Sequence, residues 1–313
     1  MAYLNPQTMG VERPSFDLVL PTLGRTASLR QFLDGLEAQS LREFRVLIAD
    51  QNRDDRVERT LIQYPELNVL RLDTPPLGLS SARNAALAHL EADIVAFPDD
   101  DCVYPPGLLQ TVAGRFDTES RLDGVVGMAV DAHGEPSAAS RWDESGGPLT
   151  LHNVWRRAVS ITIFLRRHVV EQVGQFDESL GLGSGTRFQS GEEVDYLIRA
   201  LRRGSRLEYD PSIRVVHPQG PADGAAVAQI AARNGLAMGR LLRRHYGPVF
   251  SLYMIGRAGG GALRAAATRD RPQWIVHSNA LRGRLTGYAF SDSHATGTAR
   301  GPARWMCRDP RGP

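Results

Sequence analysis

The sequence contains no lysine, only two cysteines and no long apolar run. Its positive charge at neutral pH therefore comes from arginine, which we attribute to biased genomic composition. Cys102 and Cys307 are far apart and form neither a disulfide framework nor a metal-binding spacing, so we expect a reducing compartment. No segment approaches the roughly 20 apolar residues that span a bilayer, and residues 1–14 lack the apolar stretch of a signal peptide. These absences predict a cytoplasmic protein.

Two common phosphate-binding loops are also missing. The sequence has no G-x-x-x-x-G-K-[ST] motif and no G-x-G-x-x-G motif after its first predicted strand. This argues against a P-loop enzyme and against a dinucleotide-dependent enzyme. With 313 residues, of which 42% are hydrophobic and 23% charged, the chain can bury a full core. We therefore expect one large soluble domain with appendages.

Opposite charges divide the chain. Residues 221–313 hold 14 arginines, four aspartates and no glutamate, a formal charge of +10, whereas residues 1–220 carry −8. The tail is polar and rich in glycine, proline and arginine, which is typical of disorder. We expect an N-terminal tail over residues 1–14, a main domain over 15–220, a helical extension over 221–268 and a basic, disordered tail over 269–313.

The helical extension has two interpretations. Residues 225–245 are alanine-rich, and residues 249–267 are apolar but interrupted by Arg257 and three glycines. Arginine beside leucine, phenylalanine and tyrosine at helical spacing is typical of a helix that lies on an anionic membrane, here the inner face of the cell membrane. The alternative is a helical cap packed on the main domain. No folded motif supports nucleic-acid binding, so we expect no nucleic-acid partner.

Residues 93–106, D-I-V-A-F-P-D-D-D-C-V-Y-P-P, organise the main domain. The apolar run Ile94–Phe97 predicts a buried strand of a parallel sheet, and ligands of such sheets gather beyond the carboxyl ends of the strands. Asp99, Asp100 and Asp101 follow, and a hard cation such as Mg²⁺ or Mn²⁺ would offset their repulsion while also holding phosphates. This predicts a site for a metal and a diphosphate. The alternative is a solvated turn in which Asp101 or a neighbour caps the next helix.

Strands and helices alternate through the main domain. Leu29, Phe32, Leu33 and Leu36 fall at i, i+3, i+4 and i+7, which predicts one face of a helix. The pattern predicts an α/β fold, a mostly parallel sheet flanked by helices, followed by the C-terminal helical extension. The predicted order is strand 16–21, helix near 29–36, strand 44–49, helix 56–64, strand 67–72, helix from 80 or 81 to 89, and strand 94–97.

Polar residues stand at successive strand ends. Pro21, Thr22 and Arg25 follow the first strand, Asp50 ends the second, and the three aspartates follow the fourth. A carboxylate such as Asp50 can accept from a base N–H or a ribose hydroxyl, and Arg25 or Arg83 can reach phosphate or base oxygens. Each residue alone is typical of a cap or a surface pair. Their convergence on one edge of a parallel sheet indicates a nucleotide site.

Several motifs then occur in the order of a known family. Together, over about residues 16–217, they resemble the family 2 glycosyltransferases with the GT-A fold, which transfer a sugar from a nucleotide diphosphate donor with inversion at the anomeric carbon. The motifs are Phe16–Arg25, Ile48-Ala-Asp50, Gly78-Leu-Ser-Ser-Ala-Arg-Asn84, Phe97-Pro-Asp-Asp-Asp101, Val173-Gly-Gln-Phe-Asp-Glu178, Ser190-Gly-Glu-Glu-Val-Asp195 and Val215-Val-His217.

The resemblance implies roles for the matching residues. Asp50 and Arg83 would contact the base, Asp99 the ribose and Asp101 the metal, with His217 a further metal ligand. The remaining donor-binding residues would be Pro21, Thr22, Arg25, Asn84 and Asp100. The sequence does not name the sugar or the base, for which uridine is the first choice and thymidine or guanosine the next. A glycan or lipid-linked acceptor, in polysaccharide or cell-surface glycan synthesis, would receive the sugar.

The base of the reaction departs from the family pattern. Where the family usually has Glu-Asp, this chain has Glu192-Glu193, so Glu193 would be the base, with a longer reach, and Glu192 is the alternative. Sugar transfer needs such a base and a cation on the leaving diphosphate. Acids are also favoured in the first turn of a helix, predicted here over residues 192–202, for structural reasons alone. His217 is equally typical of a buried core histidine.

Other interpretations stay open. The glycine-rich segment Gly181–Gly191 is either a lid that excludes water from the donor or a surface insertion. A sugar-nucleotide pyrophosphorylase would need a glycine-rich nucleotide loop, and Pro21–Arg25 is a poor one. A metal-dependent phosphohydrolase could use the same carboxylates. A non-catalytic protein could bind a nucleotide sugar without turning it over.

Overall fold

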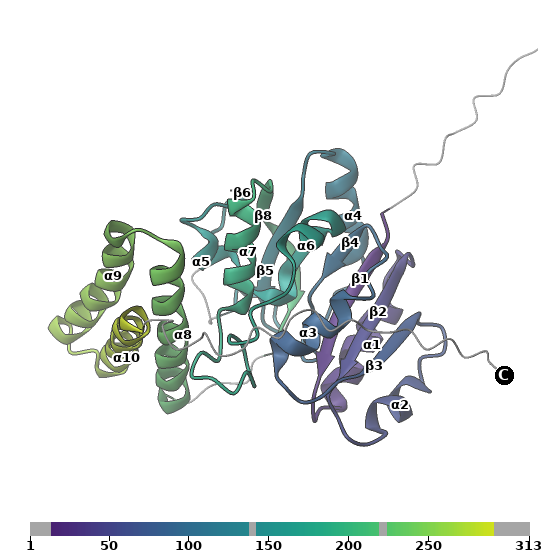
Figure 1. Cartoon of the computed structure of the whole chain (residues 1–313), viewed down its shortest axis with the longest axis horizontal. Coiled ribbons are helices and arrows are strands. Elements are labelled where there is room, and N and C mark those ends of the chain that lie inside the picture. The colour runs from purple at the N-terminus through teal and green to yellow at the C-terminus, as the bar shows by residue number, and fades with distance from the viewer. Residues whose placement is uncertain (1–13, 138–141, 219–223, 291–313) are drawn as a thin grey trace, which may run out of the picture.

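The computed structural model describes residues 14–137, 142–218 and 224–290. Figure 1 shows a sheet domain with helices packed around it and a bundle of three C-terminal helices at one side. The strands of the sheet follow the order β3-β2-β1-β4-β7-β5-β8-β6. The α/β fold expected from the alternating pattern is confirmed.

The strands are β1 Phe16–Thr22, β2 Phe44–Asp50, β3 Val69–Asp73, β4 Ile94–Ala96, β5 Gly124–Val130, β6 Gly147–Pro148, β7 Ile163–Arg166 and β8 Leu207–Val216. The helices of the sheet domain are α1 Ala27–Glu37, α2 Arg56–Leu61, α3 Leu79–Leu87, α4 Leu108–Thr118, α5 Val154–Arg157, the 3₁₀ turn η1 Ser160–Thr162, α6 Arg167–Val173 and α7 Glu192–Arg202. The extension consists of α8 Gly224–His245, α9 Pro248–Ala267 and α10 Arg271–Ala289.

The first half of the sheet is parallel and aligns its strand ends. β1 pairs with β2 and β4, and β2 with β3, all in parallel, so that Thr22 lies opposite Asp50. β7 is antiparallel to both β4 and β5, whereas β5 and β8 pair in parallel. At the end of β8, the backbone N–H of His217 donates to Val130 O at 2.8 Å. The carboxyl ends of β1, β2, β4 and β8 therefore meet at one edge of the sheet.

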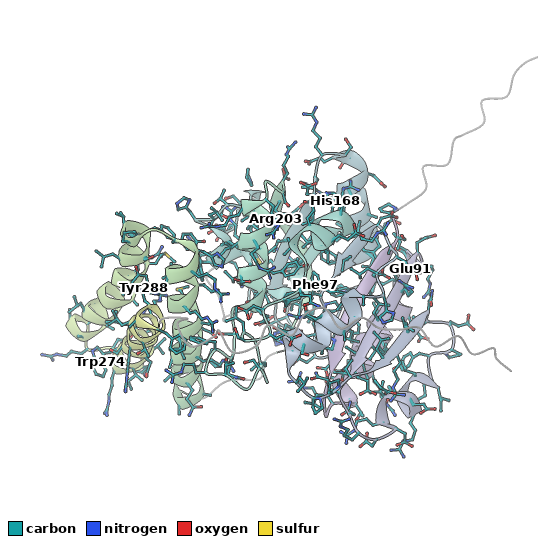
Figure 2. All side chains as sticks on the ribbon, in the orientation of Figure 1. Glu91, Phe97, His168, Arg203, Trp274 and Tyr288 are labelled. Carbon is teal, nitrogen blue, oxygen red and sulfur yellow. The ribbon has the colours of Figure 1, made fainter. Side chains whose placement is uncertain are left out.

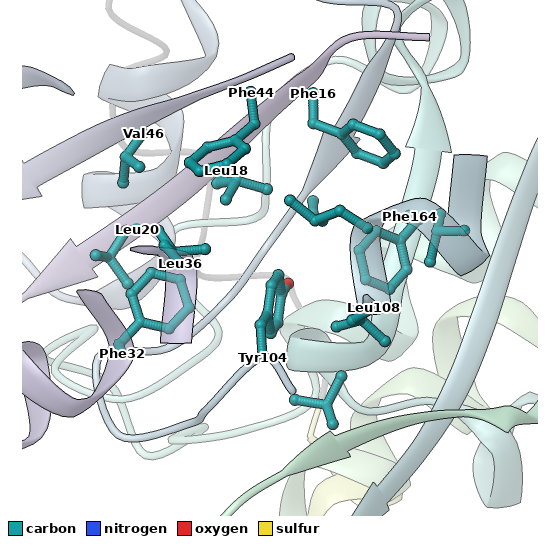
Figure 3. Close-up of a cluster of buried hydrophobic side chains, with 14 of the residues drawn as sticks. Phe16, Leu18, Leu20, Phe32, Leu36, Phe44, Val46, Tyr104, Leu108 and Phe164 are labelled. Atoms are coloured by element: carbon teal, nitrogen blue, oxygen red, sulfur yellow. The ribbon is translucent and has the colours of Figure 1, made fainter. Parts of the chain in front are cut away.

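The core explains why the central strands read as unbroken apolar runs. All seven residues of β1 are buried, because helices cover both faces of the sheet. Phe16, Leu18 and Leu20 point to one face, where Phe32 of α1 and Tyr104 pack against them (Figure 3). Val19 points to the other face, in the cluster that holds Phe97, Phe176 and Tyr196. The rings of Phe176 and Tyr196 stack at 4.1 Å, and Phe97 meets them edge-on at 5.2 and 5.8 Å, which ties the second half of the chain to the end of β4.

The extension corrects one expectation. Residues 269–313 were expected to be disordered, but Arg271–Ala289 form the helix α10. This helix packs on α8 through glycines: a Cβ at Gly287 would lie 2.0 Å from Leu236 O, and one at Gly239 would lie 2.2 Å from Arg284 O. The contact joins backbone to backbone, so the sequence shows no apolar stripe to reveal it. Residues 291–313 lie outside the described residues.

Helix α8 docks on α7 through a buried ion pair. Asp195 is 1% exposed, and its carboxylate oxygens lie 2.7 Å from His245 Nε2 of α8 and 2.7 Å from Arg199 Nε. Arg244 of α8 also donates to Asp177 at 2.7 Å. Burial would raise the pKa of Asp195, but His245 and Arg199 outweigh it and lower that pKa. The extension is therefore fixed to the helix that begins with Glu192 and Glu193.

In the three ranges that the structure describes, no helix combines the length and the apolar character needed to cross a membrane.

Candidate active site

A hollow of about 380 Å³ opens at the edge where the parallel strands end. Loops that follow β1, β2, β4 and β8 contribute to it, as does the glycine-rich segment before α7. It is polar on the side of the three aspartates and apolar on the side of the leucines. The lining residues are Pro21, Thr22, Leu23, Arg25, Gln51, Pro76, Gly78, Leu79, Asp99, Asp100, Asp101, Leu182, Gly183 and His217.

The aspartates bind neighbouring side chains and do not cap a helix. Arg25 Nη1 lies 2.9 Å from Asp100 Oδ1 and also contacts the Asp101 carboxylate. Thr22 Oγ1 donates to Asp100 Oδ2 at 2.7 Å. Helix α4 begins at Gly107 with no side-chain cap, so the solvated-turn interpretation of the aspartates is not supported. The three carboxylates are instead held toward the hollow by cations and a hydroxyl.

The charges of these groups influence one another. Burial raises the pKa of Asp100, although Thr22 and Arg25 act against it. Burial also acts to raise the pKa of Asp101, but His217 and Arg25 outweigh burial and lower that pKa. The hydrogen bond to Asp101 raises the pKa of His217. The contact between Asp101 and His217 therefore favours the carboxylate form of Asp101 and the protonated form of His217.

Asp101 and His217 are the two predicted metal ligands, and the structure brings them together. His217 Nε2 lies 3.2 Å from Asp101 Oδ1, although 116 residues separate them in sequence. Within the described ranges, no group of three or more histidine, cysteine or acidic side chains converges as a metal cage. Mg²⁺ and Mn²⁺ sites often have only one or two protein ligands, because phosphate and water supply the others. The donor set thus fits a cation that binds together with a diphosphate.

Arg83, a predicted contact of the base, is engaged by other residues in this structure. Its side chain is fully buried, with Nη2 2.9 Å from Asp99 Oδ1 and Nη1 3.4 Å from Glu192 Oε1. The guanidinium also lies over the Phe176 ring, 5.4 Å from its centroid. Contact between Arg83 and a base would have to replace one of these contacts and stays a prediction. In this structure Arg83 instead connects the aspartates after β4 with the first turn of α7.

Asn84, a predicted donor-binding residue, makes several hydrogen bonds within the protein. Its amide oxygen accepts from Phe176 N at 2.7 Å, and its Nδ2 donates to Phe176 O at 3.0 Å. The same Nδ2 lies 3.1 Å from Glu178 Oε1. These bonds occupy the amide away from the hollow. Asn84 therefore clamps the segment that leads to α7, and a contact with the donor stays a prediction.

Asp50 lies at the end of β2, behind the hollow. It is fully buried, and Oδ1 accepts from Asn52 while Oδ2 accepts from Arg71 Nε at 2.8 Å. A contact between Asp50 and a base would have to replace one of these bonds. Gln51, the next residue, lines the hollow and accepts from Gly78 N at 3.2 Å. Contact with the base by Asp50 stays a prediction.

Glu192 and Glu193 begin α7 but differ in their surroundings. Glu192 is buried beside Arg83, whereas Glu193 is partly exposed. Burial raises the pKa of Glu192, although Arg83 opposes the shift. Burial and the adjacent Glu192 carboxylate raise the pKa of Glu193 to about 8. Glu192 is thus tied to a cation, and Glu193 is the more accessible carboxyl.

The glycine-rich segment before α7 forms a wall of the hollow. Leu182 O accepts from Leu79 N at 2.8 Å, and a Cβ at Gly78 would lie 2.6 Å from the backbone of Gly183. Gly78 also has φ +102°, a conformation that other residues rarely adopt. The segment therefore packs on the start of α3 and is not a detached surface insertion. Whether it opens and closes as a lid stays a prediction.

Sequence reasoning missed some residues of this site. Gln51 and Leu182 line the hollow, and Ser160 Oγ lies 3.4 Å from Asp99 Oδ2. Gln51 directly follows the strand-end residue Asp50, so its position could have indicated a role. Ser160 gives no such signal, because η1 reaches Asp99 only through the tertiary fold.

Residues 17–170 match the family described as Glycosyl transferase family 2. These residues, about half of the chain, are a family 2 glycosyltransferase domain. It is 27% identical over 210 residues to the pre-mycofactocin glycosyltransferase of Mycobacterium tuberculosis, covering 64% of this chain and 42% of that protein. It is 29% identical over 240 residues to the succinoglycan biosynthesis protein ExoM of Rhizobium meliloti, covering 70% and 72%. The chain thus spans less than half the length of the mycobacterial relative.

Solved structures of two glycosyl-donor complexes share the fold. The mannosyltransferase PcManGT of Pyrobaculum calidifontis, in complex with GDP-Man and Mn²⁺, has a TM-score of 0.62 at 14% identity, with 88% of each chain covered. S. aureus TarS 1–349 in complex with UDP-GlcNAc has a TM-score of 0.55 at 18% identity, covering 88% of this chain and 90% of that one. The GT-A fold expected from the family 2 motifs is confirmed.

Proposed function

We propose that this family 2 protein is an inverting glycosyltransferase that moves a sugar from a nucleotide diphosphate donor to an acceptor hydroxyl. The observation that carries the proposal is the bridge made by the buried Arg83. It joins Asp99, at the hollow, to Glu192, which precedes Glu193 in the first turn of α7. Arg83 thereby connects the residues suited to hold a donor with the helix turn that carries a residue suited to accept a proton.

The donor would bind along the hollow with its diphosphate near Arg25. This guanidinium lies against two carboxylates, but it is half exposed. Phosphate oxygens can therefore reach it. Asp101 and His217 would hold Mg²⁺ or Mn²⁺, which, when bound, neutralises charge on the leaving diphosphate. The complexes of PcManGT with GDP-Man and Mn²⁺ and of TarS with UDP-GlcNAc support a nucleotide-sugar donor.

Glu193 would accept the proton of the attacking hydroxyl. The acceptor oxygen forms a bond to the anomeric carbon from the face opposite the diphosphate, and the bond to the diphosphate oxygen breaks. The proton passes to a Glu193 carboxylate oxygen, and the nucleoside diphosphate leaves. The raised pKa of Glu193 makes its carboxylate a stronger base, and the ionised form is the one that accepts the proton. Glu192 is less suited because Arg83 engages its carboxylate.

The acceptor would be a glycan or a lipid-linked sugar, in polysaccharide or cell-surface glycan synthesis. The similarity to ExoM, a succinoglycan biosynthesis protein, supports this choice. A metal-dependent phosphohydrolase and a non-catalytic nucleotide-sugar binding protein are the alternatives.

Donor binding by calorimetry tests the metal and donor parts of the proposal. UDP-, dTDP- and GDP-sugars are titrated with and without Mn²⁺ into the full chain, into Asp101→Ala and into Asp117→Ala, a control at an exposed position on α4. We expect Mn²⁺-dependent binding of one donor class that Asp101→Ala abolishes and Asp117→Ala retains. A donor at 100 times its Kd should also add about 2.7 kcal/mol to the free energy of unfolding.

Two results would contradict the proposal. The metal site fails if Asp101→Ala binds the donor with unchanged affinity and unchanged Mn²⁺ dependence. A phosphohydrolase would release inorganic phosphate from phosphate esters without any sugar acceptor, and a binding protein would bind the donor with no release of nucleoside diphosphate.

A further inference from the structure

Helix α9 carries an exposed apolar stripe along its outer side. Val249, Leu252 and Leu263 are 83%, 72% and 74% exposed, and Tyr253 is 57% exposed. With Gly256 and Gly260 between them, these positions recur every three or four residues, so they share one face of the helix. The opposite face, with Met254, Ile255 and Ala258, is buried. Exposed apolar surface of this extent marks a site of interaction.

Arginines border the stripe on one side. Arg257 and Arg264 follow Tyr253 and Gly260 by four residues, are exposed, and form no ion pair in the described residues. Beside them a groove of about 1,090 Å³ runs between α9, α10 and α5, with Phe250, Met254 and Arg284 among its walls. The groove thus combines apolar walls with guanidinium groups.

Three cations of the groove, Arg257, Arg264 and Arg284, form no ion pair among the described residues, whereas Arg156, which also lines it, pairs with Asp143. Arg284 reaches only the Met254 carbonyl, and its Nε has no hydrogen-bond partner among the described residues. Burial and the charge of Arg257 lower the pKa of Arg284. Asp270 is the one carboxylate among the described residues that line the groove, and it accepts from Gln273 N at the start of α10. An anion would relieve this unbalanced positive charge.

The surrounding surface has the same sign. Residues 224–290 contain ten arginines, one aspartate and no glutamate. Figure 2 shows Trp274 and Tyr288 on this extension, on the opposite side of the molecule from Glu91. An apolar stripe bordered by arginine matches a bilayer with anionic headgroups: apolar side chains enter the boundary of the acyl chains while arginine stays at the phosphate level.

We propose that the outer face of α9 and the adjoining groove dock on an anionic lipid membrane, with lipid phosphates at Arg257 and Arg264 and acyl chains against the apolar stripe. This surface is distinct from the hollow that would take the donor. It would hold the enzyme at a membrane while that hollow stays open to water. The proposal does not depend on the chemistry proposed for Glu193.

Vesicle co-sedimentation of the full chain tests this docking. One set of vesicles is pure phosphatidylcholine, and the other contains about 30% phosphatidylglycerol. We expect at least about tenfold stronger partitioning to the anionic vesicles at about 0.05 M salt, and loss of most of this difference at about 0.5 M.

Variants locate the surface. Arg257→Gln with Arg264→Gln should weaken partitioning to anionic vesicles about 10-fold or more, since each arginine near such a surface contributes roughly 1 kcal/mol. Leu252→Ser should weaken partitioning several-fold on each kind of vesicle, neutral or anionic, that the wild type binds. Arg282→Gln is the matched control, because Arg282 is exposed on α10 but does not line the groove, and we expect a change of less than about twofold. Thermal melts confirm that each variant is folded.

Three outcomes would overturn the proposal. The first is equal partitioning to neutral and anionic vesicles, or wild-type partitioning by the double arginine variant. The second is binding of inorganic phosphate by the wild type that the double arginine variant loses, while neither protein binds vesicles. That result would assign the arginines to a soluble anion. The third is a dimer by light scattering that Leu252→Ser dissociates without altering vesicle binding, which would assign the stripe to a second copy of the chain.

Discussion

The sheet domain and the helical extension of this family 2 protein are held together in different ways. In the sheet domain, apolar side chains fill the space between strands and helices, as Phe16, Phe32 and Phe164 do in Figure 3. In the extension, α8 and α10 approach until glycine backbones touch, at Gly239 and Gly287. Packing in the sheet domain thus depends on apolar side chains, whereas packing of α8 on α10 depends on glycines, which have no side chain.

Charge differs between the two regions as well. Around the hollow, each arginine contacts two carboxylates: Arg25 binds Asp100 and Asp101, and Arg83 binds Asp99 and Glu192. In the extension, arginines outnumber acids ten to one over residues 224–290. Paired charges suit a preorganised site that waits for a small ligand, whereas an excess of charge of one sign suits a large anionic surface. The difference predicts that chemistry depends on the sheet domain and location on the extension.

The largest effect should come from the proposed base. Glu193→Gln keeps the size of the side chain but cannot accept a proton, so transfer should fall by about 10²-fold or more while donor binding stays near normal. Glu192→Gln should lose less. Rates of nucleoside diphosphate release and donor titrations measure both. If Glu192→Gln is the inactive variant and Glu193→Gln is active, the base is the neighbouring residue; if both transfer normally, the base lies elsewhere.

The next effect tests the glycine contact of the extension. Helix propensity alone predicts that Gly287→Ala stabilises the protein by about 1 kcal/mol. A methyl group there would meet the Leu236 carbonyl, so we expect destabilisation by about 2–3 kcal/mol. Gly256→Ala on α9 is the matched control, because nothing lies within 4 Å of its added methyl group, and it should be stabilising. Urea unfolding measures both. A more stable Gly287→Ala would contradict the close packing of α8 and α10.

The smallest effect concerns pH. The pKa of Glu193 is about 8 in the folded protein, against an ordinary value of 4.5. Between these values the folded protein holds a proton that the unfolded chain has released, so this residue makes stability fall as pH rises. Glu193→Gln removes that contribution and should reduce the loss of unfolding free energy between about pH 5 and pH 8.5 by about 1–3 kcal/mol.

Urea unfolding at the two pH values checks this expectation, with Gly287→Ala as the control from the other region. The extension has no glutamate, so that variant should keep the wild-type dependence on pH. Equal pH dependence of the wild type and Glu193→Gln would show that the Glu193 carboxyl is not perturbed by burial.

Much of the fold and part of the site followed from local patterns. The apolar run before Asp99 predicted β4, and the i, i+3, i+4, i+7 spacing from Leu29 predicted α1. Arg25 and the aspartates meet at one edge because parallel strands end there together. In contrast, α10 escaped prediction because its contact with α8 uses glycine, which carries no hydrophobic signal.

The sequence by itself determined the alternation of strands and helices, the order of the family motifs and the placement of acids after strands. Each of these depends on residues close together in the chain, where backbone preference and apolar spacing act directly. Only the tertiary structure decided what the polar atoms do. It buried Arg83 between Asp99 and Glu192, turned Asn84 toward the backbone of Phe176, and brought His217 to Asp101. These contacts join segments far apart in sequence, so they exist only once the sheet and α7 have packed together.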